Sequence, residues 1–106
     1  MKLKLITASL ALALSACSGI TLTDAGEKVR VLDPGEVASC REKGKTNNSV
    51  TSKFVLERPA DVVAGELIMM ARNSAGRMGA DTIVPLTIVH NGQQTFKVYK
   101  CVDPDG

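Results

Sequence analysis

The 106-residue chain is poor in aromatic side chains and contains no tryptophan. Its only aromatic residues are Phe54, Phe96 and Tyr99, and no basic cluster has stacking residues between its charges. A nucleic-acid-binding surface needs such a cluster, so we expect no nucleic-acid partner. The apolar segment from Leu5 to Leu14 has ten residues, whereas a membrane-spanning helix needs roughly twenty. No other stretch is a candidate for spanning a membrane, and we expect the remainder of the chain to be soluble.

Residues that commonly bind metals are also scarce. His90 is the only histidine and lies beside the sequence Asn91-Gly92, with no second ligand near it in the sequence. We interpret it as a surface turn residue rather than a metal ligand or a catalytic base. Thioether ligands suit Cu(I), but Met70 and Met78 fall on the predicted core side of a helix, where methionine packs well. We therefore expect no metal site.

The sequence offers no recognisable catalytic motif. Cys40 and Cys101 do not form a Cys-x-x-Cys arrangement, which a thioredoxin-like activity would need. The glycine-containing stretches "GEVASC" and "GRMGAD" do not match a phosphate-binding loop. No nucleophile, base and oxyanion set can be assigned. We expect a protein that is not an enzyme, with no catalytic residues and no cofactor.

The N-terminus has the layout of a secretory signal over residues 1–16. Lys2 and Lys4 precede the apolar segment, and small residues follow it. The sequence Leu14-Ser15-Ala16-Cys17 resembles the lipobox of bacterial lipoproteins, which implies cleavage before Cys17 and attachment of lipid to its thiol. Ser18 follows instead of aspartate, which in Gram-negative lipoproteins implies transport to the outer membrane. The alternative is ordinary cleavage, for example after Ser15 or Ser18.

The cysteine count agrees with this interpretation. Three cysteines are an odd number, and lipidation of Cys17 leaves Cys40 and Cys101 for each other. An oxidising periplasm favours a disulfide between them, and two buried free thiols are the alternative. The bond would close a loop of about sixty residues, worth about 4 kcal/mol in the chain-entropy model.

The mature chain has the size of one small domain. We predict a lipidated tether over 17–28, a single domain over 29–102 and a C-terminal tail over 103–106. From Cys17 to Val29 the tether reaches at most ~40 Å. Within the domain, the sequence predicts strands at 29–32 and 36–46 and a turn or loop at 47–49. The role of 50–59 stays open, although Phe54, Val55 and Leu56 need burial.

The segment after Pro59 carries the clearest helix pattern. Proline suits the first turn of a helix, and Gly79 suits a C-terminal stop. Gly65 and Gly76 each cost ~1 kcal/mol relative to alanine. We expect them, together with neighbouring alanines, to let the helix lie close on a sheet. One apolar side of the helix repeats at helical spacing: Val63, Leu67, Met70, Ala71, Ser74, Ala75 and Met78.

Residues 81–102 have the pattern of a β-hairpin. Asn91-Gly92 favours a two-residue type I′ turn, which pairs Val84 with Tyr99. In the same register, Leu86 pairs with Lys97 and Ile88 with Thr95. Proline cannot donate to a ladder, so Pro85 indicates an edge strand or a bulge. Both sides of the hairpin carry apolar residues. One helix covers one side, and we expect the other to be covered by 50–57, a second copy or a partner.

The stretches "AGEKVRVLDPGEVASC", "MGAD" and "VYKC", combined with the lipobox, resemble a family of small bacterial lipoproteins of unknown function. This is the YjeI-like domain of unknown function family 4156, more distantly similar to the envelope-stress sensor RcsF. The resemblance implies an α+β domain: one helix packed on a small mixed or antiparallel sheet of about four strands. It also implies an outer-membrane address. RcsF differs in having four domain cysteines and a long proline-rich segment after its lipidated cysteine.

These features together predict a non-enzymatic lipoprotein, anchored in the outer membrane and facing the periplasm. Its expected partners are the membrane, through the lipid, and an envelope protein or a second copy of itself. Two alternatives remain open. One is an envelope-stress signalling input like RcsF. The other is a small redox or metal-handling protein that uses Cys40, Cys101, His90 or the methionines.

Overall fold

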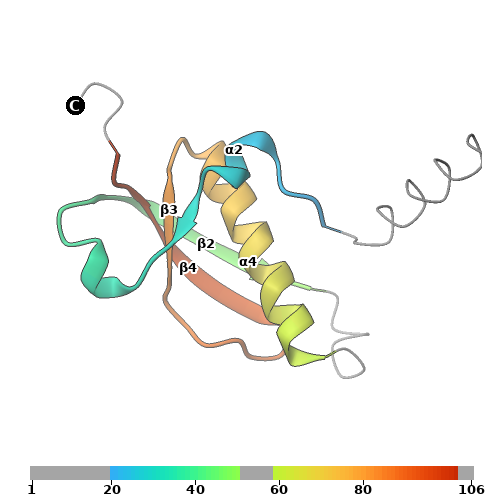
Figure 1. Cartoon of the computed structure of the whole chain (residues 1–106). Helices are drawn as coiled ribbons and strands as arrows, with labels where there is room; N and C mark the ends of the chain where they lie inside the picture. The colour runs from blue at the N-terminus through green and yellow to red at the C-terminus, as the bar shows by residue number, and fades with distance from the viewer. Residues whose placement is uncertain (1–19, 51–58, 103–106) are drawn as a thin grey trace, which may run out of the picture.

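The computed structural model describes residues 20–50 and 59–102, and shows one long helix packed on a four-stranded sheet (Figure 1). The signal segment, Cys17, the apolar residues Phe54 to Leu56 and the tail 103–106 lie outside the described residues. The elements are helix α2 (Asp24–Glu27), strand β1 (Arg30–Val31), the 3₁₀ turn η2 (Pro34–Glu36), strand β2 (Arg41–Ser49), helix α4 (Ala60–Arg77), strand β3 (Thr82–Pro85) and strand β4 (Gln93–Lys100).

The sheet has the strand order β1-β3-β4-β2 and mixes both kinds of pairing. Strands β1 and β3 are parallel, whereas β4 pairs antiparallel with both β3 and β2. The predicted α+β class, with one helix on a mixed or antiparallel sheet of about four strands, is therefore confirmed, and the sheet is mixed. Among the described residues, no helix combines the length and the apolar character that crossing a membrane requires.

Helix α4 begins and ends where the sequence predicts. Pro59 is the N-cap residue, with its carbonyl accepting from Val62 and Val63. Gly79 adopts a φ of 73°, the left-handed region that glycine enters without strain. The N–H of Ala80 donates to the carbonyl of Ala75 at 2.9 Å, and the N–H of Gly79 donates to Gly76 at 3.1 Å. This pair of bonds is a Schellman motif, which satisfies carbonyls at the end of the helix.

The main core lies between α4 and the sheet. From the sheet, Ile83, Phe96 and Val98 are fully buried, and from the helix Ala71 and Ala75 are fully buried. The small alanines bring the helix backbone close to the strands. The predicted apolar side of the helix is only partly correct, because Met70 and Ser74 are half-buried and Met78 is exposed.

Strand β2 starts later and runs further than predicted. Residues 36–40 are outside it, and Cys40 immediately precedes its first residue. The predicted loop at 47–49 is wrong, because Asn47, Asn48 and Ser49 pair with residues 95, 94 and 93 of β4. Asn48 is buried, and its amide donates to backbone carbonyls at 3.3 and 3.4 Å. The pairing with β4 and the long-range bond to Gln94 override the turn preference of asparagine.

The hairpin turn was predicted correctly, but not the register. Asn91 and Gly92 both have positive φ, and His90 pairs with Gln93 across the turn. Further along, however, Val84 pairs with Lys97 instead of Tyr99. The shift arises in residues 86–89, where the N–H groups of residues 86 and 87 both donate to the carbonyl of Thr95. This bulge follows Pro85, whose strand is not an edge but lies between β1 and β4.

The second side of the hairpin is partly covered by the chain itself. Thr82 is fully buried and Val84 is 3% exposed, so neither a second copy nor a partner is needed to cover them. Three of the apolar residues that stay exposed lie in or next to the bulge, Leu86, Ile88 and Val89, and a fourth, Val102, follows β4.

The predicted tether contains an ordered helix that lies against α4. The side chain of Asn73 accepts from the N–H of Thr23 and donates to the carbonyl of Thr21, both at 2.9 Å. Arg72 donates to the carbonyls of Gly26 and Glu27 at 3.2 and 3.1 Å. Residues 21–27 are therefore held on the helix surface and do not act as a free linker.

The glycines of α4 do not have the role that the sequence suggested. A Cβ at Gly76 would lie 2.8 Å from the Cβ of Ala25. The glycine therefore allows α2, and not the sheet, to approach the helix closely. A Cβ at Gly65 would meet nothing within 4 Å. Only one of the two glycines is therefore required by packing.

Candidate functional site

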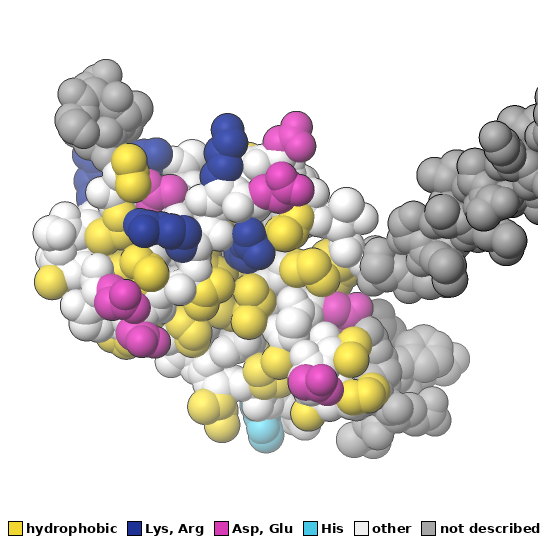
Figure 2. Space-filling view, viewed as in Figure 1, with side chains coloured by type: hydrophobic (Ala, Val, Ile, Leu, Met, Phe, Trp, Pro, Cys, Tyr) yellow, Lys and Arg dark blue, Asp and Glu magenta, His cyan; other side chains and the backbone are white. Residues whose placement is uncertain are grey.

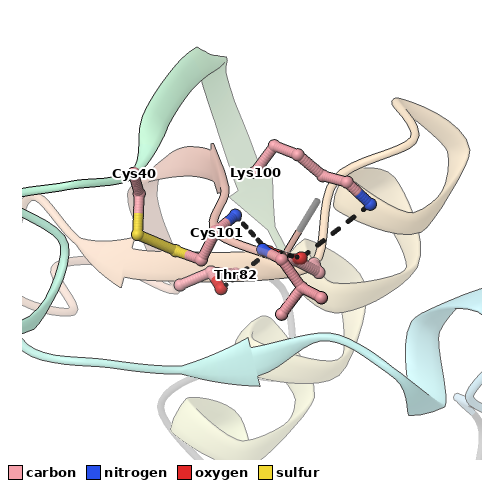
Figure 3. The surroundings of a disulfide bond; sticks show 6 residues. Cys40, Thr82, Lys100 and Cys101 are labelled. Atoms are coloured by element: carbon pink, nitrogen blue, oxygen red, sulfur yellow. Dashed lines mark hydrogen bonds and ion pairs between the residues drawn. A yellow bond between two sulfur atoms is a disulfide. The ribbon is translucent and has the colours of Figure 1, made fainter. Parts of the chain in front are cut away.

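A disulfide joins Cys40 to Cys101, as predicted, with a Cα–Cα distance of 4.4 Å (Figure 3). The two cysteines flank the first pair of the β2–β4 ladder, Arg41 with Lys100. The bond therefore closes one end of the ladder and links residues that are 61 positions apart in the sequence.

Beside the disulfide, the carboxylate of Asp81 organises the end of β4. One oxygen accepts from the N–H of Cys101 at 2.8 Å and from the hydroxyl of Thr82 at 3.0 Å. The other accepts from the N–H of Val102 at 2.8 Å and lies 3.8 Å from the ammonium group of Lys100 (Figure 3). The side chain of Asp81 is 14% exposed. Both oxygens of the carboxylate thus interact with neighbouring donor groups.

These contacts decide the ionisation of Asp81. Burial is the largest single influence and raises the pKa, because it disfavours the charged form. The backbone N–H groups of Cys101 and Val102, the Thr82 hydroxyl and the charge of Lys100 act in the opposite direction. Together they hold the pKa of Asp81 below its ordinary value, so the carboxylate is ionised at neutral pH.

At the other end of the sheet, an apolar surface is open to solvent. Ile88 is 82% exposed and Leu86 is 45% exposed, while Val89 is 36% exposed. We call these three residues the apolar arm. A groove of about 480 Å³ separates the arm from the first turns of α4. Its lining residues are Ala60, Asp61, Val63, Ala64, Val89, Asn91 and Gly92.

A second, larger groove of about 810 Å³ lies near α2. Three of the five charged residues that line it are cationic. Lys28, Arg30 and Lys100 line it, and we call it the basic groove. Two carboxylates, Asp24 and Asp81, also line it. Figure 2 shows Lys and Arg side chains gathered toward the end of the molecule that carries α2 and β1.

A family model matches residues 20–101, under the description "Domain of unknown function (DUF4156)". The chain belongs to this family. No curated protein matches the chain, and neither does any solved structure. The predicted membership is thus confirmed over the described domain, whereas the more distant likeness to RcsF has no support in these comparisons.

In this DUF4156 domain, two of the residues considered as metal ligands, His90 and Met78, lie near opposite ends of β4. His90 is exposed beside the turn, and one of its ring nitrogens lies 3.2 Å from the amide of Asn91. Met78 lies near Gly44, where its methyl group would be 3.2 Å from an added Cβ. Within residues 20–50 and 59–102, no group of three or more His, Cys, Asp or Glu side chains could hold a metal ion.

Several residues that matter to the DUF4156 structure were not found from the sequence. Asp81 bonds to a residue 20 positions away, and Asn73 bonds to one 52 positions away. Neither spacing leaves a local pattern. The exposed apolar residues were visible in the sequence as a surplus on the hairpin. Only the bulge that follows β3 identifies which of them remain outside the core.

Proposed function

We propose that this DUF4156 protein is a non-enzymatic lipoprotein that is anchored to the outer membrane through Cys17 and binds an envelope protein in the periplasm. Three observations support the location. The N-terminus has the sequence pattern of a signal segment and resembles a lipobox, one cysteine is left over after pairing, and the Cys40–Cys101 disulfide suits an oxidising compartment.

The observation that carries the binding role is the apolar arm. A side chain such as Ile88, 82% exposed next to two more apolar residues and a groove, leaves apolar surface in water. Exposed apolar side chains gathered in one short segment, rather than scattered singly, are typical of a protein interaction site. Because the arm extends from a bulge, its residues take no part in the main core, and substitutions there should leave the fold intact.

The anchor can be tested by mass spectrometry of the protein purified from its natural membrane. We expect the first peptide to start at Cys17 and to carry the mass of a diacylglycerol and an additional acyl chain. An unmodified peptide, or one that starts at another residue, would refute the proposed anchor.

The binding role can be tested by photo-crosslinking in intact cells. A photoreactive amino acid is placed at Ile88 and, as a matched control, at the exposed Lys43 on β2. We expect a discrete crosslinked product from position 88 only, and its loss when Leu86 and Val89 are changed to serine. A product with the mass of a second copy would assign the arm to self-association. Identical products from both positions, or none from position 88, would refute the proposed surface.

A further inference from the structure

The basic groove is built from three segments that are distant in sequence. Lys28 follows α2, Arg30 belongs to β1 and Lys100 ends β4. Gly79 and Ala80, which have no charged side chain, also line the groove. Its volume is about 810 Å³.

The two carboxylates offset part of the charge of these three cations. The oxygens of Asp81 already receive three hydrogen bonds, two from backbone N–H groups and one from Thr82. The ammonium group of Lys100 lies 3.8 Å from a carboxylate oxygen of Asp81 and forms an ion pair with it. Lys28 and Arg30 are exposed, and among the described residues Asp24 is the one other carboxylate that lines the groove. The lining that the structure describes therefore has three cations and two carboxylates, a net charge of +1, which favours an anionic ligand.

The docked N-terminal segment places this groove close to the proposed anchor. Thr21 is bonded to Asn73, so only four peptide links separate Cys17 from a point fixed on the domain. Four residues reach at most ~14 Å. This step depends on the proposed lipidation of Cys17. Given that anchor, the elements that follow Thr21 directly, α2 and β1, must lie near the membrane surface.

We propose that the basic groove binds the phosphate headgroups of anionic lipids in the membrane that carries the anchor. Two arguments support this ligand: the positive charge of the groove and the short reach of the chain between Cys17 and Thr21. Basic residues held within a Debye length of an anionic surface contribute to binding additively, and the lipid anchor keeps them there.

The same arrangement would direct the apolar arm away from the bilayer. Gly79 and Ala80 line the basic groove at one end of α4, whereas Ala60 to Ala64 line the groove beside the arm at the other. The 18 residues of α4 separate these ends by about 27 Å. An orientation with the basic groove on the lipid therefore leaves the arm accessible to a periplasmic partner.

The test uses vesicle co-sedimentation of the mature chain from residue 17, with Cys17→Ser so that no lipid holds it. Vesicles of phosphatidylcholine alone are compared with vesicles that also contain phosphatidylglycerol. We expect binding only to the anionic vesicles, weakening as salt rises. The variant Lys28→Gln/Arg30→Gln should bind about 30-fold more weakly. The control Lys43→Gln/Lys45→Gln removes the same charge from β2, at the opposite edge of the sheet, and should change binding less than about threefold.

Equal losses in the two variants would refute the groove as the site, as would a failure to bind anionic vesicles. Soluble glycerol phosphate is used to distinguish a lipid headgroup from a free phosphate compound as the ligand. If it shifts the NMR signals of Lys28 and Arg30 while vesicles do not bind, the membrane is not the ligand and the proposal fails. Because this chain carries no lipid, the result is independent of the mass measurement at Cys17. A missing anchor and an inactive groove are therefore separate outcomes.

Discussion

The carboxylate of Asp81 accepts a hydrogen bond from the N–H of Cys101 at 2.8 Å, across 20 residues of sequence. This bond ties the start of β3 to the residue whose sulfur atom is joined to Cys40. The end of the sheet is thus fastened twice, by a covalent bond to β2 and by a charged hydrogen bond to β3. Removal of either link should lower the free energy of unfolding by a measurable amount.

Replacing Asp81 by asparagine should lower the free energy of unfolding by about 2 kcal/mol at neutral pH, because it removes a charged acceptor from two backbone donors. The folded pKa of Asp81 is below its ordinary value of 3.8, so its ionised form stabilises the fold above that value. This contribution is lost as pH falls through the folded pKa. Urea unfolding as a function of pH should therefore show the two proteins converging in acid. The exposed Glu27→Gln serves as a control, and an equal effect there would contradict a special role for Asp81.

Replacing both Cys40 and Cys101 by serine should cost about 4 kcal/mol of stability, since the disulfide closes a loop across 61 residues. Small domains have only about 5–15 kcal/mol in total, so the variant should unfold at much lower urea concentration. Cys17→Ser should leave the urea midpoint unchanged.

The same bond distinguishes a structural role from a redox role. In glutathione buffers we expect a reduction potential below about −300 mV, typical of structural disulfides in secreted proteins. A potential near −180 mV, like that of disulfide isomerases, would instead favour the redox alternative.

The parts of the fold that the sequence predicted are those with local signals. Pro59 and Gly79 bound the helix, and Asn91-Gly92 makes its turn, because each depends on the backbone preference of one or two residues. The disulfide followed from counting cysteines and from the inferred compartment.

The parts that were missed depend on distant partners. Asn48 belongs to a strand because Gln94 lies opposite it, and nothing near Asn48 in the sequence indicates this. The register of the hairpin changed because residues 86 and 87 share one acceptor, Thr95, which a strict alternating pattern does not anticipate. The candidate surfaces share this origin. The apolar arm exists because of that bulge, and the basic groove gathers residues from three separate segments.

Two glycines in the same helix should respond in opposite ways to alanine. Gly65→Ala should raise stability by about 1 kcal/mol, because a Cβ there meets nothing and alanine favours the helix. Gly76→Ala gains the same helix preference but places its Cβ 2.8 Å from Ala25, so we expect a net loss of about 1–2 kcal/mol. Urea unfolding of both variants tests the contact. Equal stabilisation would mean that α2 does not pack tightly on α4.

The docking of the N-terminal segment should depend on Asn73. Asn73→Ala removes the bonds to Thr21 and Thr23, each worth about 1 kcal/mol, so backbone amides of residues 23–28 should exchange with deuterium about 30-fold faster. The free energy of global unfolding should change little, because no residue of α2 belongs to the main core. Val29, which does belong to it, follows α2 in the sequence. Ser74→Ala, one position further along α4, is the matched control and should leave this exchange unchanged. If the amides of 23–28 exchange at the same rate in Asn73→Ala, the segment is held by the Arg72 hydrogen bonds and by the packing of Ala25 on Gly76. In that case the short reach between Cys17 and the domain would rest on these contacts and not on the asparagine.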